Sequence, residues 1–191
     1  MLSLSKHASR LSLSKTSCGT ALRQAQRGGA IAIAAGRTAE VARVVAIEPM
    51  VRAAAGVWTQ SVLPQYEKQF AQPFEERERA IRVENAALPE IEIEAKLHAA
   101  RRIRLAPIAA LGVENGIDAG RWDFTELIAD YPRPLWIAVA GVKRSVFLED
   151  ERRFAAQHGG PHVRVTVYDG ASHSLQRDAF ARFAPDLEAF L

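Results

Sequence analysis

One histidine in this 191-residue sequence lies where an imidazole could accept a proton in a reaction. His173 stands in the loop "DGASHS", which follows the apolar run "HVRVTVY" and precedes a helical pattern that ends the sequence. Open α/β sheets place their functional groups in loops that follow the C-terminal ends of parallel strands. The alternative is a solvated loop histidine that caps the last helix.

The other metal-binding or nucleophilic side chains form no comparable pattern. No carboxylate or cysteine stands at metal-ligand spacing from the remaining histidines, which are His7, His98, His158 and His162. With a single cysteine, Cys18, the chain has no intramolecular disulfide and no cysteine cluster to hold a structural metal. The sequence therefore predicts no metal site and no cofactor.

Three apolar runs predict the strands that position His173. Residues 41–47, except Arg43, and residues 134–141 are apolar on both faces, as central parallel strands are. Residues 162–170 alternate instead, with three valines on one face. Helical patterns precede the first run over "GGAIAIAAG", with Gly36 as its end, and precede the third run at 149–157. Apolar residues at helical spacing mark a terminal helix: Phe180, Phe183, Leu187 and Phe190. Such alternation predicts an α/β fold with a mostly parallel sheet and flanking helices.

The segment between the first two strands reads as helical. Residues 50–130 are rich in helix formers, with breaks expected at Pro89 and Pro107. We expect this segment to be a helical insertion between the two parts of the core, 28–49 and 131–191. Residues 1–27 contain the repeated unit "LSLSK" and read as a disordered, basic, Ser-rich segment.

Composition and charge exclude several classes of protein. With 48% hydrophobic residues and a net charge of +3, the chain is not wholly disordered, and it has no apolar run long enough to span a membrane. We expect a soluble, cytoplasmic protein. Residues 1–39 hold six basic side chains and no carboxylate, so the rest is acidic. That segment has no aromatic residue for base stacking, so we expect no nucleic-acid partner. The alternative is a non-catalytic binding module that docks through this basic segment.

Taken in order, these stretches resemble the α/β-hydrolase superfamily. "YDGASHSL" resembles its C-terminal histidine loop, "RPLWIAVAG" its penultimate strand, and "GGAIAIAAGRTAEVARVVAIEP" the helix and strand that follow the nucleophile elbow. The resemblance covers residues 28–191 and implies a partial α/β-hydrolase fold with a helical cap at 50–130. It implies hydrolysis of an ester or related bond in a small molecule, with His173 as the general base of a nucleophile–histidine–acid triad.

The acid of the triad departs from the common pattern. Where the family usually has an aspartate three residues after a glycine, Arg144 stands, and a cation cannot orient the imidazole. Some members take the acid from the strand before the cap, and this position implies Glu48 as the partner of His173. The alternative is that Glu48 is a polar residue at a strand end. Trp58, Trp122 and Phe124 either line a substrate cleft beneath the cap or anchor the cap helices.

The nucleophile departs further. The elbow of the family reads G-x-S-x-G-G, and the corresponding "QAQRGG" has Gln26 at the nucleophile, followed by Arg27 and Gly28. No strand is expected before residue 28. We therefore expect a truncated hydrolase with little or no activity and with an exposed sheet edge that favours self-association. The alternative is that another hydroxyl replaces the elbow serine; the candidates are Ser145, Ser172 and Ser174.

Overall fold

The structure is a computed structural model and describes residues 19–24, 26–38, 40–86, 88–141 and 145–191, with side chains from residue 28 onward. The "LSLSK" repeat, Cys18, His7 and Arg144 lie outside the described residues. The chain forms two compact units. The first contains the sheet, from residues up to Arg52 and from Asp123 onward, and the second is Ala53–Trp122.

The first unit is built on a four-stranded parallel sheet in the order β1-β2-β3-β4. The strands span Gly19–Gln24 (β1), Val41–Ile47 (β2), Leu135–Ala140 (β3) and Val163–Tyr168 (β4). All six residues of β3 are buried, as is expected for a central strand covered on both faces. Every neighbouring pair of strands is parallel, so every carboxyl end lies at the same edge of the sheet.

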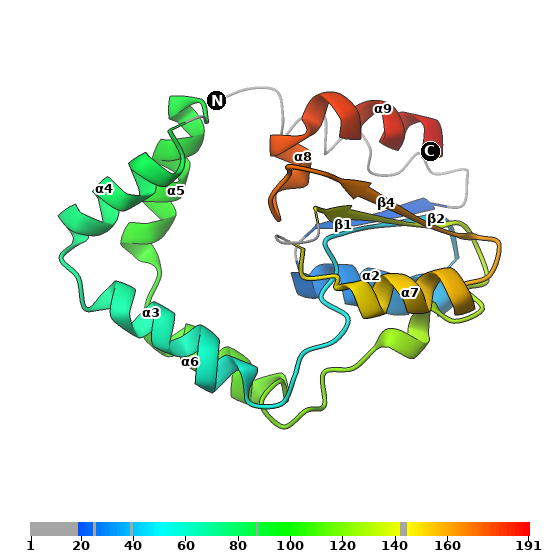
Figure 1. The fold of residues 1–191 in the computed structure, drawn as a ribbon, viewed down its shortest axis with the longest axis horizontal. Helices are drawn as coiled ribbons and strands as arrows, with labels where there is room; N and C mark the ends of the chain where they lie inside the picture. Colours follow the sequence, from blue (N-terminus) through cyan, green and yellow to red (C-terminus); the bar gives the residue numbers. More distant parts are fainter. Residues whose placement is uncertain (1–18, 25, 39, 87, 142–144) are drawn as a thin grey trace. The chain divides into compact units, whose positions relative to one another are not determined.

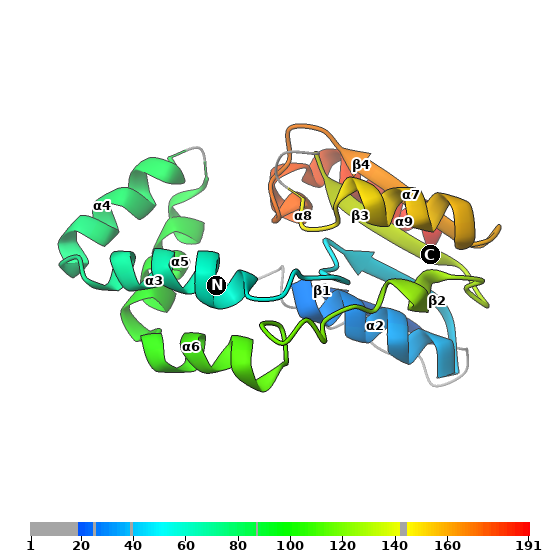
Figure 2. The ribbon, with the colours of Figure 1, turned by 60° about the horizontal axis from the view of Figure 1, so that its bottom comes forward.

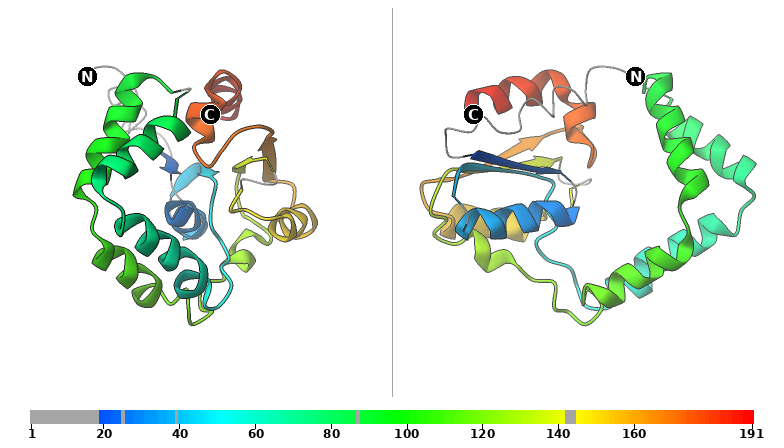
Figure 3. Two further views of the ribbon diagram at one scale, coloured as in Figure 1. Left: turned by 60° about the vertical axis from the view of Figure 1, so that its left-hand side comes forward. Right: turned by 180° about the vertical axis from the view of Figure 1, so that it is seen from behind.

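Helices cover both faces of this sheet (Figure 1). Helices α2 (Gln26–Thr38) and α7 (Glu149–His158) lie on one face, while α8 (Leu175–Asp178) and α9 (Phe180–Phe190) lie on the other. Figures 2 and 3 show the same layers from other sides. A short 3-10 helix, η2 (Thr125–Ile128), leads toward β3. The predicted α/β fold with a mostly parallel sheet is confirmed.

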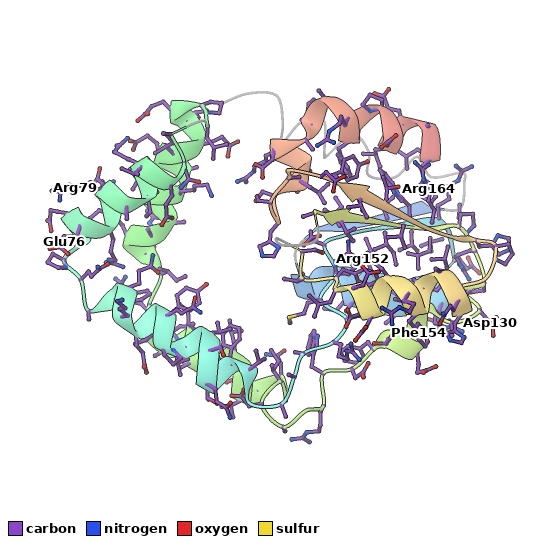
Figure 4. The ribbon with its side chains drawn as sticks, viewed as in Figure 1. Glu76, Arg79, Asp130, Arg152, Phe154 and Arg164 are labelled. Carbon is purple, nitrogen blue, oxygen red and sulfur yellow. The ribbon has the colours of Figure 1, made fainter. Side chains whose placement is uncertain are left out.

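The core beneath α9 is aromatic. Trp136 of β3 is fully buried and stacks on Phe183 with ring centroids 5.5 Å apart. The hydroxyl of Tyr168 donates to Asp186 at 2.5 Å, and burial raises the pKa of this tyrosine. Arg164 projects from β4 on the α9 side (Figure 4), and its Nη2 lies 3.9 Å from Oδ1 of Asp186. These contacts pin the last helix to the two strands that precede the His173 loop.

Two expectations for the N-terminal part of this unit were wrong. We expected no strand before residue 28, yet β1 pairs in parallel with β2. The pairing depends on a neighbouring strand, so the sequence of residues 19–24 does not reveal it. We also expected Gly36 to end its helix, but α2 continues to Thr38. Gly36 is needed for packing instead, because a Cβ there would collide with the hydroxyl of Tyr131 and with Val44.

The last strand and helix also differ in detail from their patterns. The three valines of β4 are not its buried face: Val167 is 39% exposed, and Tyr168 is buried under α9. Phe180 was expected on the apolar face of the terminal helix, yet it is 56% exposed. It is the first residue of α9, one turn before the part of the helix that contacts Trp136. Strands β1 and β4 are the edges of the described sheet, and self-association through an edge stays a prediction.

The second unit is helical and lies within the 50–130 segment. It contains a one-turn π-helix, η1 (Trp58–Val62), followed by α3 (Leu63–Phe70), α4 (Phe74–Glu84), α5 (Glu90–Arg102) and α6 (Leu105–Glu114). Helix α3 packs beside α6, and α4 packs beside α5 (Figure 1).

Prolines and charges in the second unit follow simple physical rules. Pro89 precedes α5, as expected, but Pro107 lies in the first turn of α6, where a missing N–H costs nothing. Arg82 of α4 bridges to α5 through Glu90 at 2.8 Å and Glu94 at 2.5 Å. Figure 4 shows Glu76 and Arg79 projecting outward from α4.

None of the helices in the described part of the chain combines the length and apolar character that crossing a bilayer requires. Within the same residues, no group of three or more histidine, cysteine, aspartate or glutamate side chains could hold a metal ion.

Candidate active site

The loops at the carboxyl edge of the sheet bring together residues that are far apart in sequence. Strand β2 ends at Ile47 and is followed directly by Glu48, while β4 ends at Tyr168 and leads into the loop that carries His173. Because the strands are parallel neighbours through β3, both loops emerge at one edge. This edge is where a doubly wound or open α/β sheet places its site.

Glu48 and His173 are in direct contact. Nδ1 of His173 lies 3.0 Å from Oε2 of Glu48, although 125 residues separate the two in sequence. The glutamate side chain is 2% exposed, whereas the imidazole is 48% exposed. The arrangement therefore joins a buried carboxylate to an imidazole that solvent can reach.

The carboxylate of Glu48 is held by three further donors. Oε1 accepts the backbone N–H of Ala140 at 2.5 Å and lies 2.9 Å from Oγ of Ser145. Oε2 accepts the backbone N–H of Val146 at 3.0 Å. Such donors satisfy the oxygens of a buried carboxylate and fix its orientation. A carboxylate fixed in this way can hold the imidazole ring in one orientation.

The backbone at Glu48 is also unusual, with a φ of 47° in the left-handed region. A non-glycine residue rarely adopts this conformation, and such outliers gather at functional sites. Next to it, Pro49 lies against Gly29 of α2: a Cβ on Gly29 would come within 2.6 Å of Pro49 Cβ. Gly29 thus allows the first turns of α2 to approach the acid closely.

The loop that carries His173 is shaped by local contacts. It begins at Gly170, whose φ of 81° favours glycine. Ser172 then donates its hydroxyl to the carboxylate of Asp178, which also accepts the Ser172 backbone N–H at 2.9 Å. These bonds connect the residue before His173 to the end of α8 and so hold the loop in place.

The contact decides what the imidazole can do. In the neutral ring, the tautomer that donates Nδ1–H to Glu48 leaves the lone pair of Nε2 available as a base. When Nε2 takes a proton, the carboxylate stabilises the imidazolium cation. The pair can therefore accept a proton from a hydroxyl or water and return it to a leaving group.

The elbow region joins the same edge of the sheet. Gln24 pairs with Ile47 at the end of β1, and α2 begins at Gln26. Gln26, Arg27 and Gly28 thus form the start of a helix that directly follows a strand. The strand-to-helix order fits the elbow to which the resemblance assigned these residues, with a glutamine in place of the serine.

The other sequence candidates are placed as follows. Trp58 donates its indole N–H to Ile108 O at 2.9 Å and fills the space beside Gly112, so it anchors α6 within the second unit. Trp122 is buried in that unit, and Phe124, in the first unit, donates its backbone N–H to Val51 O at 2.8 Å. A role for these three residues in substrate binding stays a prediction.

Ser145 has a role that the sequence did not reveal. It was considered as a replacement nucleophile, but it is buried and lies against Glu48 and Phe147. Ser172 is likewise committed to Asp178. The signal available in the sequence was only that Ser145 follows a predicted strand, which does not distinguish a nucleophile from a residue that supports the acid.

Comparisons by sequence find no match: no protein-family model matches the chain, and no curated protein matches it significantly. Comparison of structures does find relatives in fold. N-formylmaleamic acid deformylase from Pseudomonas putida S16 matches over 88% of this chain with a TM-score of 0.58 and 20% identity. An enol-lactonase from Burkholderia xenovorans LB400 matches over 91% with a TM-score of 0.61 and 15% identity. E-2-(acetamidomethylene)succinate hydrolase matches over 97% with a TM-score of 0.65 and 13% identity. The chain has an α/β-hydrolase fold.

The α/β-hydrolase fold is present in part. The chain covers 66% of the deformylase, 64% of the lactonase and 71% of the succinate hydrolase, so it spans about two thirds of their length. At these identities the likeness establishes the fold alone. What an α/β-hydrolase fold does in this chain has to be argued from its own site.

Proposed function

We propose that this chain is a hydrolase-type protein whose Glu48–His173 pair serves the cleavage of an ester or related bond in a small molecule. The 3.0 Å contact between Nδ1 and Oε2 carries the proposal. A solvated loop histidine would need no buried carboxylate, and a polar strand-end glutamate would not need four hydrogen-bonding partners. The helical second unit corresponds, in this proposal, to the cap.

The fold supports the same reaction class without naming a substrate. The three structural relatives named above are a deformylase, an enol-lactonase and a hydrolase of an acetamidomethylene succinate. All three names describe enzymes that act on small molecules, and the deformylase and the lactonase are named for the acyl group and the lactone. We infer this substrate class for the chain, and pocket shape would select among its members.

The step that the chain performs poorly is nucleophilic attack. The position of the elbow serine is taken by Gln26, whose amide is not a nucleophile, so no acyl-enzyme forms there. Loss of the nucleophile in a triad enzyme leaves about 10³- to 10⁴-fold catalysis over water. We therefore infer weak activity or none for the chain with Gln26.

The test restores the nucleophile. Gln26→Ser should produce turnover of 4-nitrophenyl acetate at least about 10²-fold above that of the unaltered chain, because it supplies a hydroxyl at the elbow position that an oriented base can activate. The gain should vanish in Gln26→Ser/His173→Ala and in Gln26→Ser/Glu48→Ala. His162, an exposed histidine just before β4, offers a matched control, and Gln26→Ser/His162→Ala should keep the gain.

Two outcomes would contradict the proposal. One is a folded Gln26→Ser variant that gains no activity toward 4-nitrophenyl acetate, a simple lactone or an enol ester. The other is a gain that survives removal of His173, since the hydroxyl would then act without the base. Circular dichroism and thermal unfolding of each variant separate loss of chemistry from loss of fold.

A further inference from the structure

The Glu48–His173 pair is oriented for proton transfer in a chain that has glutamine at the elbow. Orientation of this kind is costly to build: Glu48 is buried, takes a left-handed backbone conformation and is enclosed by the donors of Ala140, Ser145 and Val146. The pair can thus transfer protons whether or not residue 26 is a nucleophile.

We propose that the pair acts directly on water, so that this chain hydrolyses activated esters by general-base catalysis with no covalent intermediate. This inference rests on the proposed function and names the mechanism of that same site. The base is His173 rather than Glu48, because the imidazole is half exposed while the carboxylate is 2% exposed and already accepts other donors.

The chemistry balances without another reactant. Nε2 of His173 accepts a proton from a water molecule while the water oxygen forms a bond to the acyl carbon. The carbonyl π-bond electrons move to oxygen, which gives a tetrahedral oxyanion. That intermediate collapses by re-forming the C=O bond and breaking the bond to the leaving group, and the imidazolium returns the proton to the departing oxygen. Acid and alcohol are the products.

Two hydroxyl groups near the pair do not compete for this role. The hydroxyl of Ser145 is buried against Glu48 and Phe147, and that of Ser172 is bonded to Asp178. Neither is offered to Nε2 as a nucleophile. Solvent, by contrast, reaches a ring of which 48% is exposed.

General-base catalysis contributes typically about 10²- to 10⁴-fold to a rate. With 4-nitrophenyl acetate, whose leaving group departs readily so that attack limits the rate, the unaltered chain should show steady turnover without a burst. His173→Ala should lower that turnover about 10²-fold, and His162→Ala should leave it unchanged. His173→Gln is a second variant in case the alanine variant does not fold.

Intact-protein mass spectrometry during turnover supplies the decisive readout. The mechanism requires an unacylated protein at steady state and a slower rate in D₂O, because a proton moves in the attack step. The Gln26→Ser variant, measured in parallel, should carry one acetyl group on residue 26 and show a burst.

The outcomes separate this inference from the proposed function. Acetylation of His173 in the unaltered chain would overturn it, since the imidazole would then be the nucleophile. Equal rates for the unaltered chain and a folded His173→Ala variant would overturn it too, while a His173-dependent Gln26→Ser enzyme would leave the proposed function standing. A third result is also informative: the unaltered chain turns over without acylation and depends on His173, while Gln26→Ser gains nothing. This result would support attack by water and would contradict the assignment of residue 26 to the elbow.

Discussion

The hydroxyl oxygen of Ser145 lies 2.9 Å from Oε1 of Glu48, and both residues are buried. The same oxygen accepts the backbone N–H of Phe147 at 3.0 Å and lies 2.9 Å from the Phe147 carbonyl. A hydroxyl has one hydrogen, so it donates to the carboxylate or to the carbonyl at a given moment. Ser145 therefore joins the loop after β3 to the acid and is not presented as a nucleophile.

We predict that Ser145→Ala lowers the free energy of unfolding by about 1–3 kcal/mol, because it leaves the buried N–H of Phe147 without its acceptor. Urea unfolding measures the change. Ser174→Ala, a hydroxyl deletion in the partly exposed histidine loop, should shift the same quantity by no more than about 0.5 kcal/mol. Equal effects from the two variants would show that the Ser145 hydroxyl does not support the buried loop.

Glu48→Gln should change the tautomer of His173 with little change of fold. The carboxylate accepts Nδ1–H, whereas an amide can turn its NH₂ group toward Nδ1 and stabilise the Nε2–H form. Nitrogen-15 NMR of the ring distinguishes the two neutral forms at alkaline pH. The ring signals of His162 should not change. A His173 spectrum identical in both proteins would mean that Glu48 does not orient the ring in solution.

A second buried carboxylate gives a prediction for stability. Glu151 of α7 is 2% exposed and pairs with Arg52, whose Nε lies 2.9 Å from Oε1. Arg52→Met should lower the free energy of unfolding by about 2 kcal/mol, because it leaves a buried carboxylate without its partner. Arg52→Met/Glu151→Leu should recover part of that loss, since the double variant removes both charges. Thermal and urea unfolding test this; additive losses would contradict it.

Tyr131 should make the fold sensitive to alkaline pH. Its hydroxyl donates to Ile33 O at 2.8 Å, and burial raises its pKa to about 12 from an ordinary value of 10. A raised pKa means that the folded state favours the neutral phenol. Its contribution to stability is thus complete below pH 10, falls as the pH rises toward 12, and is lost above that value.

Comparison with Tyr131→Phe isolates this effect. The variant should lose about 1 kcal/mol at neutral pH with its hydrogen bond, yet its unfolding free energy should fall less steeply between pH 10 and 12. Other tyrosines titrate equally in both proteins and cancel in the difference. Parallel pH curves for the two proteins would show that Tyr131 does not ionise on unfolding.

Much of the fold follows from local pattern. The double-sided apolar runs became β2 and β3, and the amphipathic segment at 149–157 became α7, because hydrophobic periodicity responds to burial on known faces. Strand β1 escaped prediction because "GTALRQ" lacks a strong apolar pattern and is held by pairing with β2. The prediction that Gly36 ends its helix was wrong for a similar reason, since the residue that packs against it, Tyr131, lies 95 positions further along.

The candidate site divides in the same way. The loop position of His173 and the glutamine at residue 26 are properties of the sequence alone, and the resemblance pointed from them to Glu48. That Nδ1 meets Oε2 at 3.0 Å, with Ser145 behind the acid, depends on three loops that meet at one edge of a parallel sheet. Sequence determines which groups are present and which strands bury them. Only the tertiary structure decides which groups touch, because contacts between distant segments depend on strand order and packing rather than on local preference.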